Sequence, residues 1–465
     1  MRAAAGPSSV AVAILGAGLV AYLTLHLAEP RLAITWSYAH LSRRAGLREL
    51  ALALVVVLPL AASLLLRSPR LRAPARSWSP AFALPAMAAL GLALLWVTTR
   101  LPVAQLGGDR GFYLLAVNDG RPISRWSLTC WGVHALIARF VAVPAPATDM
   151  GPVLVAAQTV NLVAGVVTLA ALAGAARVVS ASLGEAIVTT LLVWSTFGVL
   201  QISAGYLDVY PIVAALLALY LWTGVRTFAG EVHPAFPLVL AAVGPFFYEG
   251  LLLTWPSALL LGAVVARTTD GGPRVRTALA IAVVAAGLAT VPVYRVPFAW
   301  WRFVADVAQQ DGAVAFGYSP TSSLIPWPYL ATVTHAREVL HTLLLVDGVG
   351  VLSVLVLGPS LVREVARDAG LAFVASIVLP FLVFVVVMDP VFGAFADWDL
   401  FSYGACATSL LGAALLVRFG RGSTLAAALV GLALAANVVH LLARFHALEV
   451  DAVRHLVESP RHVPG

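Results

Sequence analysis

Residues 370–388 read GLAFVASIVLPFLVFVVVM, a run without a single charged side chain. About 20 apolar residues in an α-helix cross the roughly 30 Å of hydrocarbon in a bilayer, so this run has the length of a transmembrane helix. Inside lipid, every backbone N–H and C=O group must find its partner within the protein, which makes a helix the default spanning element. Similar runs recur along the chain, and they decide its fold class.

The composition of the whole chain agrees with this interpretation. Of its 465 residues, 61% are hydrophobic and only 11% are charged, and the mean hydropathy is +0.93. Soluble domains carry about 25% charged residues. A transmembrane β-barrel would show alternating segments of roughly ten residues, and the sequence has none. The sequence therefore predicts an all-α, polytopic membrane protein.

Hydropathy predicts about 11–13 transmembrane helices. We expect residues 1–79 to hold two N-terminal helices, residues 80–443 to form the transmembrane core, and residues 444–465 to form a tail. The first span is interpreted as a retained anchor, because no small-x-small cleavage site follows it. The predicted spans are residues 9–28, 49–66, 80–98, 151–176, 184–200, 208–227, two short spans within 235–267, then 277–295, 338–358, 370–388, 402–418 and 423–443.

All the positive charge of the chain comes from arginine, since the sequence contains no lysine and has a formal net charge of +7. Arginine is denser in short loops such as residues 67–79 than in the long segments 99–150 and 296–337. Because cytoplasmic loops are enriched in basic residues, the loop 67–79 is expected inside. Both long segments, the turn 389–401 and the tail are then outside, with interfacial helices expected in the long segments.

Several classes of function have no support in the sequence. The arginines are scattered and form no basic face for nucleic acid. Cys130 and Cys406 are too few for a disulfide framework or a cysteine metal cage. The sequence contains no Gly-x-Ser-x-Gly elbow, no phosphate-binding Walker loop, no His-Glu-x-x-His pair and no Gly-x-Gly-x-x-Gly before a strand.

Acidic residues on the predicted outer side are candidates for function, because charge near lipid is costly. Asp109 follows a predicted span and is preceded by Gly107 and Gly108, which allow the backbone to approach a ligand closely. An aspartate that bonds its own turn is the alternative. Asp208 lies in the string GYLDVYP at 205–211, where it could bind a ligand, cap a helix, or do both.

Two further acidic stretches lie at breaks or turns between predicted spans. Glu249 lies at the break between two short helices, where it needs a polar cavity or a cation unless it reaches the interface. The turn 389–401 carries three acids, and within it Asp397 and Asp399 could bracket a cation or sugar hydroxyls while Trp398 stacks on a sugar face. A capped loop with an interfacial tryptophan is the alternative, but three acids exceed what capping needs.

Three arginines flank the second long outer segment, namely Arg295, Arg302 and Arg337. Arginine offers planar, bidentate donors for phosphate. Pairing with lipid headgroups is the general alternative for basic residues at a membrane surface. His335 and His341 lie nearby, but a separation of six residues is not a helical spacing for metal ligands.

The order of these features resembles the GT-C superfamily of polyprenyl-phosphate-sugar-dependent glycosyltransferases. The string DRGFY at 109–113 lies where that family's first outer loop carries its acid, and 205–211 looks like the acid-plus-tyrosine segment of many bacterial members. The break at 248–249 resembles the family's re-entrant pair, and DWDLF at 397–401 resembles a string of uncharacterised members. The resemblance covers roughly residues 80–420 as architecture.

The chain also departs from the family pattern. The acid pair often seen in the first outer loop is Asp109-Arg110 here, so a second acid must come from elsewhere, with Asp208 favoured. Two spans precede the family-like core, and no large soluble domain is expected after it. These departures leave the acceptor and the use of a metal open.

The resemblance implies an inverting transfer of a sugar from a polyprenyl phosphate to a glycan, lipid or protein acceptor. The reaction would take place on the outer face of a bacterial inner (plasma) membrane, without nucleic acid. Asp109 would be the catalytic base, the arginines would meet the lipid phosphate, and a divalent cation, if any, would be held by Asp109 and Asp208. The implied substrate-binding residues are Asp208, Tyr210, Glu249, Arg295, Arg302, Arg337, Asp397, Trp398 and Asp399.

Two other functions remain open. A transporter or flippase of a lipid-linked saccharide would show internal repeats and broken helices near the midplane, and no repeat is evident. A polymerase or ligase of lipid-linked glycans would share the substrate chemistry but rely on the outer arginines and a histidine.

Overall fold

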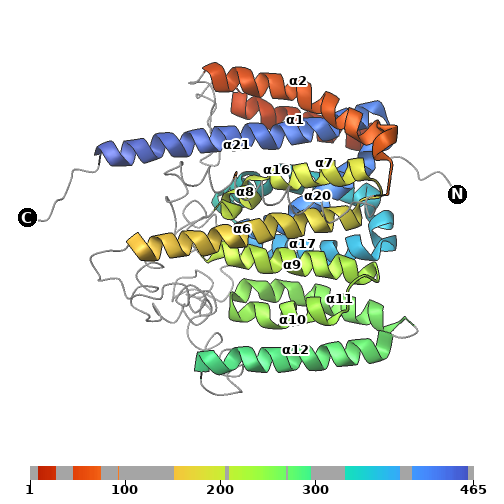
Figure 1. Ribbon diagram of the computed structural model, residues 1–465. Coiled ribbons are helices and arrows are strands. Elements are labelled where there is room, and N and C mark those ends of the chain that lie inside the picture. Colours follow the sequence, from red (N-terminus) through yellow and green to blue (C-terminus); the bar gives the residue numbers. More distant parts are fainter. Residues whose placement is uncertain are drawn as a thin grey trace, which may run out of the picture.

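The computed structural model describes residues 9–27, 45–74, 93, 151–204, 209–268, 271–294, 330–387 and 401–458. Within these ranges the chain is helical, apart from one isolated bridge between Pro74 and Ser182, so the predicted all-α class is confirmed (Figure 1). The helices are α1 Ser9–Leu27, α2 Ala45–Arg67, η2 Pro69–Leu71, α6 Gly151–Val179, α7 Leu183–Trp194, α8 Phe197–Ser203, α9 Tyr210–Phe228, α10 Ala235–Val243, η6 Gly244–Phe246, η7 Glu249–Thr254, α11 Trp255–Ala266, α12 Gly271–Tyr294, α16 Val333–Arg367, α17 Ala369–Val387, α20 Ala405–Gly420 and α21 Thr424–Glu458.

The chain is a polytopic membrane protein. In the described ranges, seven helices are long and apolar enough to cross a membrane, or eight if a bent helix pair forms one span. Every predicted span that falls on described residues coincides with a helix or a helix pair. Large apolar side chains such as Leu64, Leu259 and Val283 are exposed on the outside of the bundle, as lipid-facing positions require. Apart from residue 93, the predicted span 80–98 lies outside the described residues, as does most of the two long segments in which interfacial helices are expected.

The bundle consists of three groups of helices (Figure 1). Helices α1, α2 and α21 lie at one edge, α10, α11 and α12 at the other, and α6, α7, α9, α16, α17 and α20 between them. Close helix contacts in membranes depend on small residues, since lipid gives helices little hydrophobic reason to associate. At Gly412 of α20 the backbone of α16 at Gly350 comes so close that no Cβ could fit.

Helices α7 and α8 form one bent unit where the sequence predicts a span at 184–200. The two helices meet at an angle of 74°. At the bend, the hydroxyls of Ser195 and Thr196 both donate to the carbonyl of Leu192, a local bond that competes with helix continuation. The side-chain amide of Asn437 in α21 donates to the same carbonyl over 3.0 Å, so the bend is fixed from outside as well.

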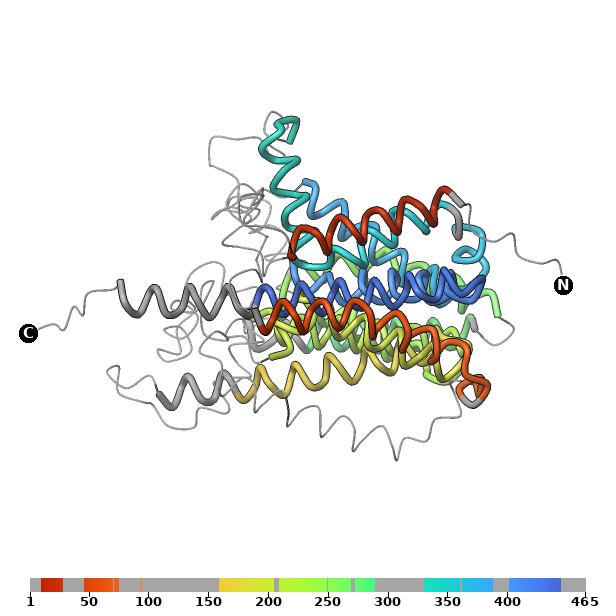
Figure 2. Tube along the Cα trace, turned by 90° about the horizontal axis from the view of Figure 1, so that it is seen from above, coloured from red at the N-terminus to blue at the C-terminus, as the bar shows by residue number. Residues whose placement is uncertain are grey.

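Helix α16 is broken at Asp347, whose backbone has φ −159° and ψ 59°. Figure 2 shows the first part of α16, in teal, turning away from the long axis of the bundle. Such a break leaves the carbonyls of the preceding turn without their usual N–H donors. The hydroxyl of Tyr22 in α1 donates to the Leu344 carbonyl over 3.0 Å and therefore replaces one of the lost donors.

A histidine replaces the next lost donor at this break. Nε2 of His440 in α21 lies 3.1 Å from the Leu345 carbonyl, and because a carbonyl only accepts, the histidine donates. The Nδ1 atom of His440 lies 3.1 Å from Nε2 of His26, and both rings are buried. Side chains of α1 and α21, which are far apart in the sequence, thus donate hydrogen bonds to the carbonyls of the broken turn of α16.

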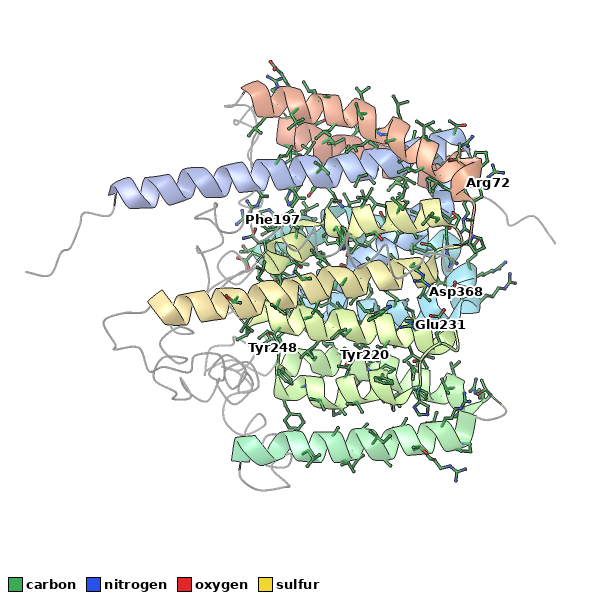
Figure 3. The ribbon with its side chains drawn as sticks, in the orientation of Figure 1. Arg72, Phe197, Tyr220, Glu231, Tyr248 and Asp368 are labelled. Carbon is green, nitrogen blue, oxygen red and sulfur yellow. The ribbon has the colours of Figure 1, made fainter. Side chains whose placement is uncertain are left out.

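One end of the bundle is rich in arginine, and we call it the basic end. The last turns of several helices reach this end, and they carry Arg67, Arg177, Arg226, Arg367 and Arg418. Figure 3 places the labelled Arg72, Glu231 and Asp368 there, with Tyr248 and Phe197 towards the other end. This one-sided distribution is the one that the positive-inside rule describes.

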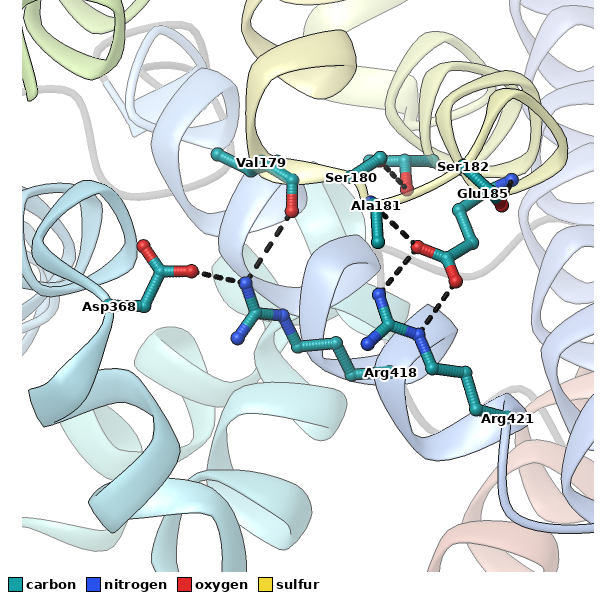
Figure 4. Close-up of polar contacts among 9 residues, drawn as sticks. Val179, Ser180, Ala181, Ser182, Glu185, Asp368, Arg418 and Arg421 are labelled. Carbon is teal, nitrogen blue, oxygen red and sulfur yellow. Dashed lines mark hydrogen bonds and ion pairs between the residues drawn. The ribbon is translucent and has the colours of Figure 1, made fainter. Parts of the chain in front are cut away.

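Ion pairs hold the helices together at the basic end (Figure 4). The guanidinium of Arg421 donates two hydrogen bonds of 2.6 Å to the Glu185 carboxylate, which also accepts from the Ala181 N–H over 2.9 Å. Beside it, Arg418 pairs with Asp368. The carboxylate of Glu185 is almost fully buried at the start of α7, so its charge depends on Arg421.

We predict that Arg421→Met lowers the free energy of unfolding by about 1.5–3 kcal/mol, because it leaves the buried Glu185 carboxylate unpaired. The double variant Glu185→Gln/Arg421→Met should recover part of this loss. Arg226→Met is the control, since Arg226 at the end of α9 pairs with Glu231 only five residues away, and the Glu231 side chain is 27% exposed against 9% for Glu185. Its loss should cost less than about 1 kcal/mol. Thermal unfolding in detergent measures the three variants; equal losses for Arg421→Met and Arg226→Met would contradict the prediction.

Candidate functional site

Three tyrosines meet at the end of the bundle opposite the basic end. The rings of Tyr210 and Tyr403 are stacked with 6.4 Å between centroids. Tyr248 lies edge-on to both, at 5.6 Å from each, and Phe381 lies 5.9 Å from Tyr403. We call these four residues the tyrosine cluster.

The four rings of the cluster come from four separate elements. Tyr210 is the first residue of α9, with Pro211 in its first turn, and Tyr248 lies in the break between η6 and η7. Tyr403 precedes α20, and Phe381 belongs to α17. Tyr210 is the half-buried ring of the four, whereas the other three are buried. The cluster therefore closes the end of the bundle and leaves one partly exposed aromatic surface.

Two glycines allow the rings to approach the backbone closely. A Cβ at Gly250 would collide with the Tyr403 hydroxyl and the Tyr248 ring, and one at Gly404 would collide with the Phe381 ring. The break at 248–250 therefore brings the backbone at Gly250 against the tyrosine cluster. The sequence predicts a break here, and the structure confirms one.

Most of the predicted site residues cannot be placed. The described ranges do not include Asp109, Asp208, Arg295, Arg302, Asp397, Trp398 and Asp399. Of Glu249 only the backbone is described, as the first residue of η7. Tyr210 and Arg337 are described in full, and Tyr210 contacts the tyrosine beside Glu249.

The residues from the start of α16 have separate roles. Arg337 is exposed and forms no ion pair with another described residue. His335 is buried, and its Nε2 donates to the Val386 carbonyl of α17 over 2.6 Å. That bond docks the start of α16 on the end of α17, so His335 has a packing role here.

The prediction of outer acids missed a buried acid, Asp347, at the break in α16. Only 3% of Asp347 is exposed. Its carboxylate accepts from the Gly350 N–H over 3.0 Å and from the Thr408 hydroxyl. The signal was present in the string DGVG at 347–350, an acid with two glycines inside an apolar run.

No group of three or more histidine, cysteine or acidic residues that could hold a metal ion occurs among the described residues. The predicted divalent ligands Asp109 and Asp208 lie outside those ranges. A divalent cation at the predicted site therefore stays a prediction.

Comparisons with known proteins add one similar structure. No protein-family model matches the chain, and no curated protein matches it. The crystal structure of ArnT from Cupriavidus metallidurans bound to undecaprenyl phosphate is similar over 80% of this chain and 78% of that one, with 12% identity and a TM-score of 0.44. A likeness of this degree does not establish an activity.

We predict that Gly250→Ala lowers the free energy of unfolding by about 1–3 kcal/mol, because the added methyl group must displace the rings of the tyrosine cluster. The control is Gly358→Ala in α16, where nothing lies within 4 Å of the added atom. The control should be neutral or stabilising, as alanine favours a helix more than glycine does. Thermal unfolding in detergent measures both variants. An unchanged stability of the Gly250→Ala protein would contradict the prediction.

Proposed function

We propose that the chain is a glycosyltransferase of the GT-C type, which moves a sugar from a polyprenyl phosphate to an acceptor on the outer face of the membrane. The tyrosine cluster is the observation that carries this proposal. It joins three segments of the chain at one end of the bundle, and each segment bears an acid predicted for function.

Chain connectivity ties two of these acids to the cluster. Asp208 precedes Tyr210 by two residues, and Asp399 precedes Tyr403 by four. In the sequence, both acids are therefore close neighbours of tyrosines that belong to the cluster.

The third acid, Glu249, directly follows Tyr248, and the backbone of both residues is described. Tyrosine rings from three segments thus meet at one end of the bundle, and the sequence of each segment contains a predicted functional acid. Carboxylates accept hydrogen bonds from sugar hydroxyls, while aromatic rings offer a flat apolar surface with a polar edge. This combination supports a carbohydrate substrate.

The distribution of arginine supports an orientation with the tyrosine cluster on the outer face of the membrane. If the basic end is cytoplasmic, as the positive-inside rule expects, the tyrosine cluster faces the exterior or the periplasm. In a bacterium this membrane would be the inner (plasma) membrane. A polyprenyl phosphate sugar would reach the cluster from the lipid, and a glycan, lipid or protein acceptor would reach it from the aqueous side.

The proposed reaction is a single displacement at the anomeric carbon. Asp109 accepts the proton of the acceptor hydroxyl, whose oxygen forms the new bond to the anomeric carbon. The bond from that carbon to the phosphate oxygen breaks, and its electron pair leaves with the polyprenyl phosphate. Arginine side chains, from Arg295, Arg302 or Arg337, stabilise the departing charge.

The other predicted residues bind the substrates in this proposal. Asp208 and Tyr210 position the acceptor or a divalent ion, and Asp397, Trp398 and Asp399 line the sugar site. Tyr210 suits that role because it is the partly exposed ring of the cluster.

We predict that Asp109→Asn lowers sugar transfer by about 100-fold to 10,000-fold, the usual contribution of a positioned base, without preventing insertion or folding. Asp119→Asn, which changes another acid of the same long segment, should retain activity. Purified full-length protein, incubated with labelled polyprenyl phosphate sugars, is assayed by thin-layer chromatography. Full activity of Asp109→Asn would overturn its assignment as the base.

A second substitution separates the transferase from its rivals. A polymerase or ligase that relies on arginine would lose activity in Arg302→Ala and keep it in Asp109→Asn, whereas the proposed transferase loses activity in both. A flippase would form no transfer product and would move the labelled lipid between leaflets in either variant. Scrambling of labelled lipid in proteoliposomes measures that outcome.

A further inference from the structure

A small cavity lies beside the break in α16. Its polar lining consists of Thr342 and Asp347 of α16 and Thr408 of α20, and the rings of Phe381 and Phe401 close its apolar side. The cavity holds about 10 Å³, which is room for one water-sized guest. A sugar or a lipid cannot enter this space, so a guest must be small and suited to oxygen donors.

Asp347 brings a carboxyl group into this cavity. One carboxylate oxygen accepts from the Gly350 N–H and the other from the Thr408 hydroxyl. Each oxygen has two lone pairs, so the carboxylate keeps accepting capacity towards the cavity. In the described part of the chain, no arginine or histidine forms an ion pair with Asp347. A buried charge without a counter-charge is costly, and a bound cation would remove that cost.

Thr342 supplies an independent observation. Its side chain is buried, and its hydroxyl oxygen has no hydrogen-bond partner among the described residues. Threonines in helices commonly donate to the carbonyl four residues earlier, as Thr168 and Thr223 do in this protein. Thr342 instead lines the same cavity as Asp347, which leaves its oxygen available to a guest.

The break in α16 places two helix ends beside the cavity. The first part of α16 ends there, and the carbonyl end of a helix carries partial negative charge, while Asp347 caps the N–H end of the second part. Broken helices in membrane proteins use such ends, together with nearby oxygens, to coordinate small cations. The side-chain donors available here are all oxygen atoms, which suit hard cations.

We propose that the cavity binds one dehydrated Na⁺ ion, held by the carboxylate of Asp347 and the hydroxyl oxygens of Thr342 and Thr408. A single carboxylate balances a monovalent ion, whereas a divalent ion would need a second acid. The proposal does not depend on the glycosyltransferase activity, because it uses residues that the proposed reaction does not.

The ion would connect the break in α16 to the tyrosine cluster. Phe381 lines the cavity and also belongs to the cluster. Thr408 follows Tyr403 by five residues, which is about 7 Å of helix rise. Na⁺ would therefore fix α16 and α20 directly below the cluster, and it would stabilise the folded state in proportion to the occupancy of the site.

The test measures thermal unfolding of the full-length protein in detergent. The melting temperature is compared in NaCl and in N-methylglucamine chloride at equal ionic strength, and it should rise with Na⁺ to a plateau. Thr342→Val should weaken apparent Na⁺ affinity about tenfold or more, since it removes a ligand oxygen. Thr223→Val is the control, because the Thr223 hydroxyl already donates to the Leu219 carbonyl, and its Na⁺ response should be unchanged.

The Thr342→Val variant also separates a ligand from a purely structural residue. Without Na⁺ it should unfold at the same or a higher temperature than the unmodified chain, because it removes a buried hydroxyl that has no protein partner. Asp347→Asn should abolish the Na⁺ response. Equal melting temperatures in the two salts would overturn the proposal, as would a Na⁺ response that survives in both variants. A response to pH alone would assign the site to a proton and would also overturn it.

Discussion

A backbone carbonyl inside hydrocarbon has no water to bond, and this constraint governs the centre of the structure. Helix α16 is broken at Asp347, so the turn before the break loses its own donors. Side chains from other helices take their place, with Tyr22 of α1 and His440 of α21 bound to successive carbonyls. Buried polar side chains therefore join helices that are distant in the chain at the irregular turn of α16.

The two ends of the bundle are built from different interactions. At the basic end, Glu185 and Asp368 each pair with an arginine, and the two pairs join α7, α16, α17 and α20. At the other end, the tyrosine cluster joins α9, α17, α20 and the break between η6 and η7 through ring contacts, and a hydrogen bond from His335 joins α16 to α17. Among the described residues, charge pairing thus belongs to the basic end and aromatic packing to the other.

The sequence predicts the helices well because hydropathy is a local property, and each predicted span in the described ranges matches a helix or helix pair. It also predicts the break at Tyr248, which the structure has between η6 and η7. The string DGVG at 347–350 signals the break at Asp347 but not the donors that satisfy it, because these lie far away in the chain: Tyr22 is 322 residues from Leu344, and His440 is 95 residues from Leu345. The stacking of Tyr403 on Tyr210 depends on the same kind of distant packing. Asp109, the central residue of the candidate site, lies outside the described residues, so its role stays a prediction.

The broken turn of α16 also sets an order for assembly in the cell. Tyr22 is synthesised long before α16, but His440 follows Leu345 by 95 residues, which takes about 5–20 s of translation. Until α21 enters the membrane, the Leu345 carbonyl lacks the donor that His440 supplies. A nascent chain that has not yet made α21 therefore holds the broken turn of α16 with Tyr22 in place and His440 still missing.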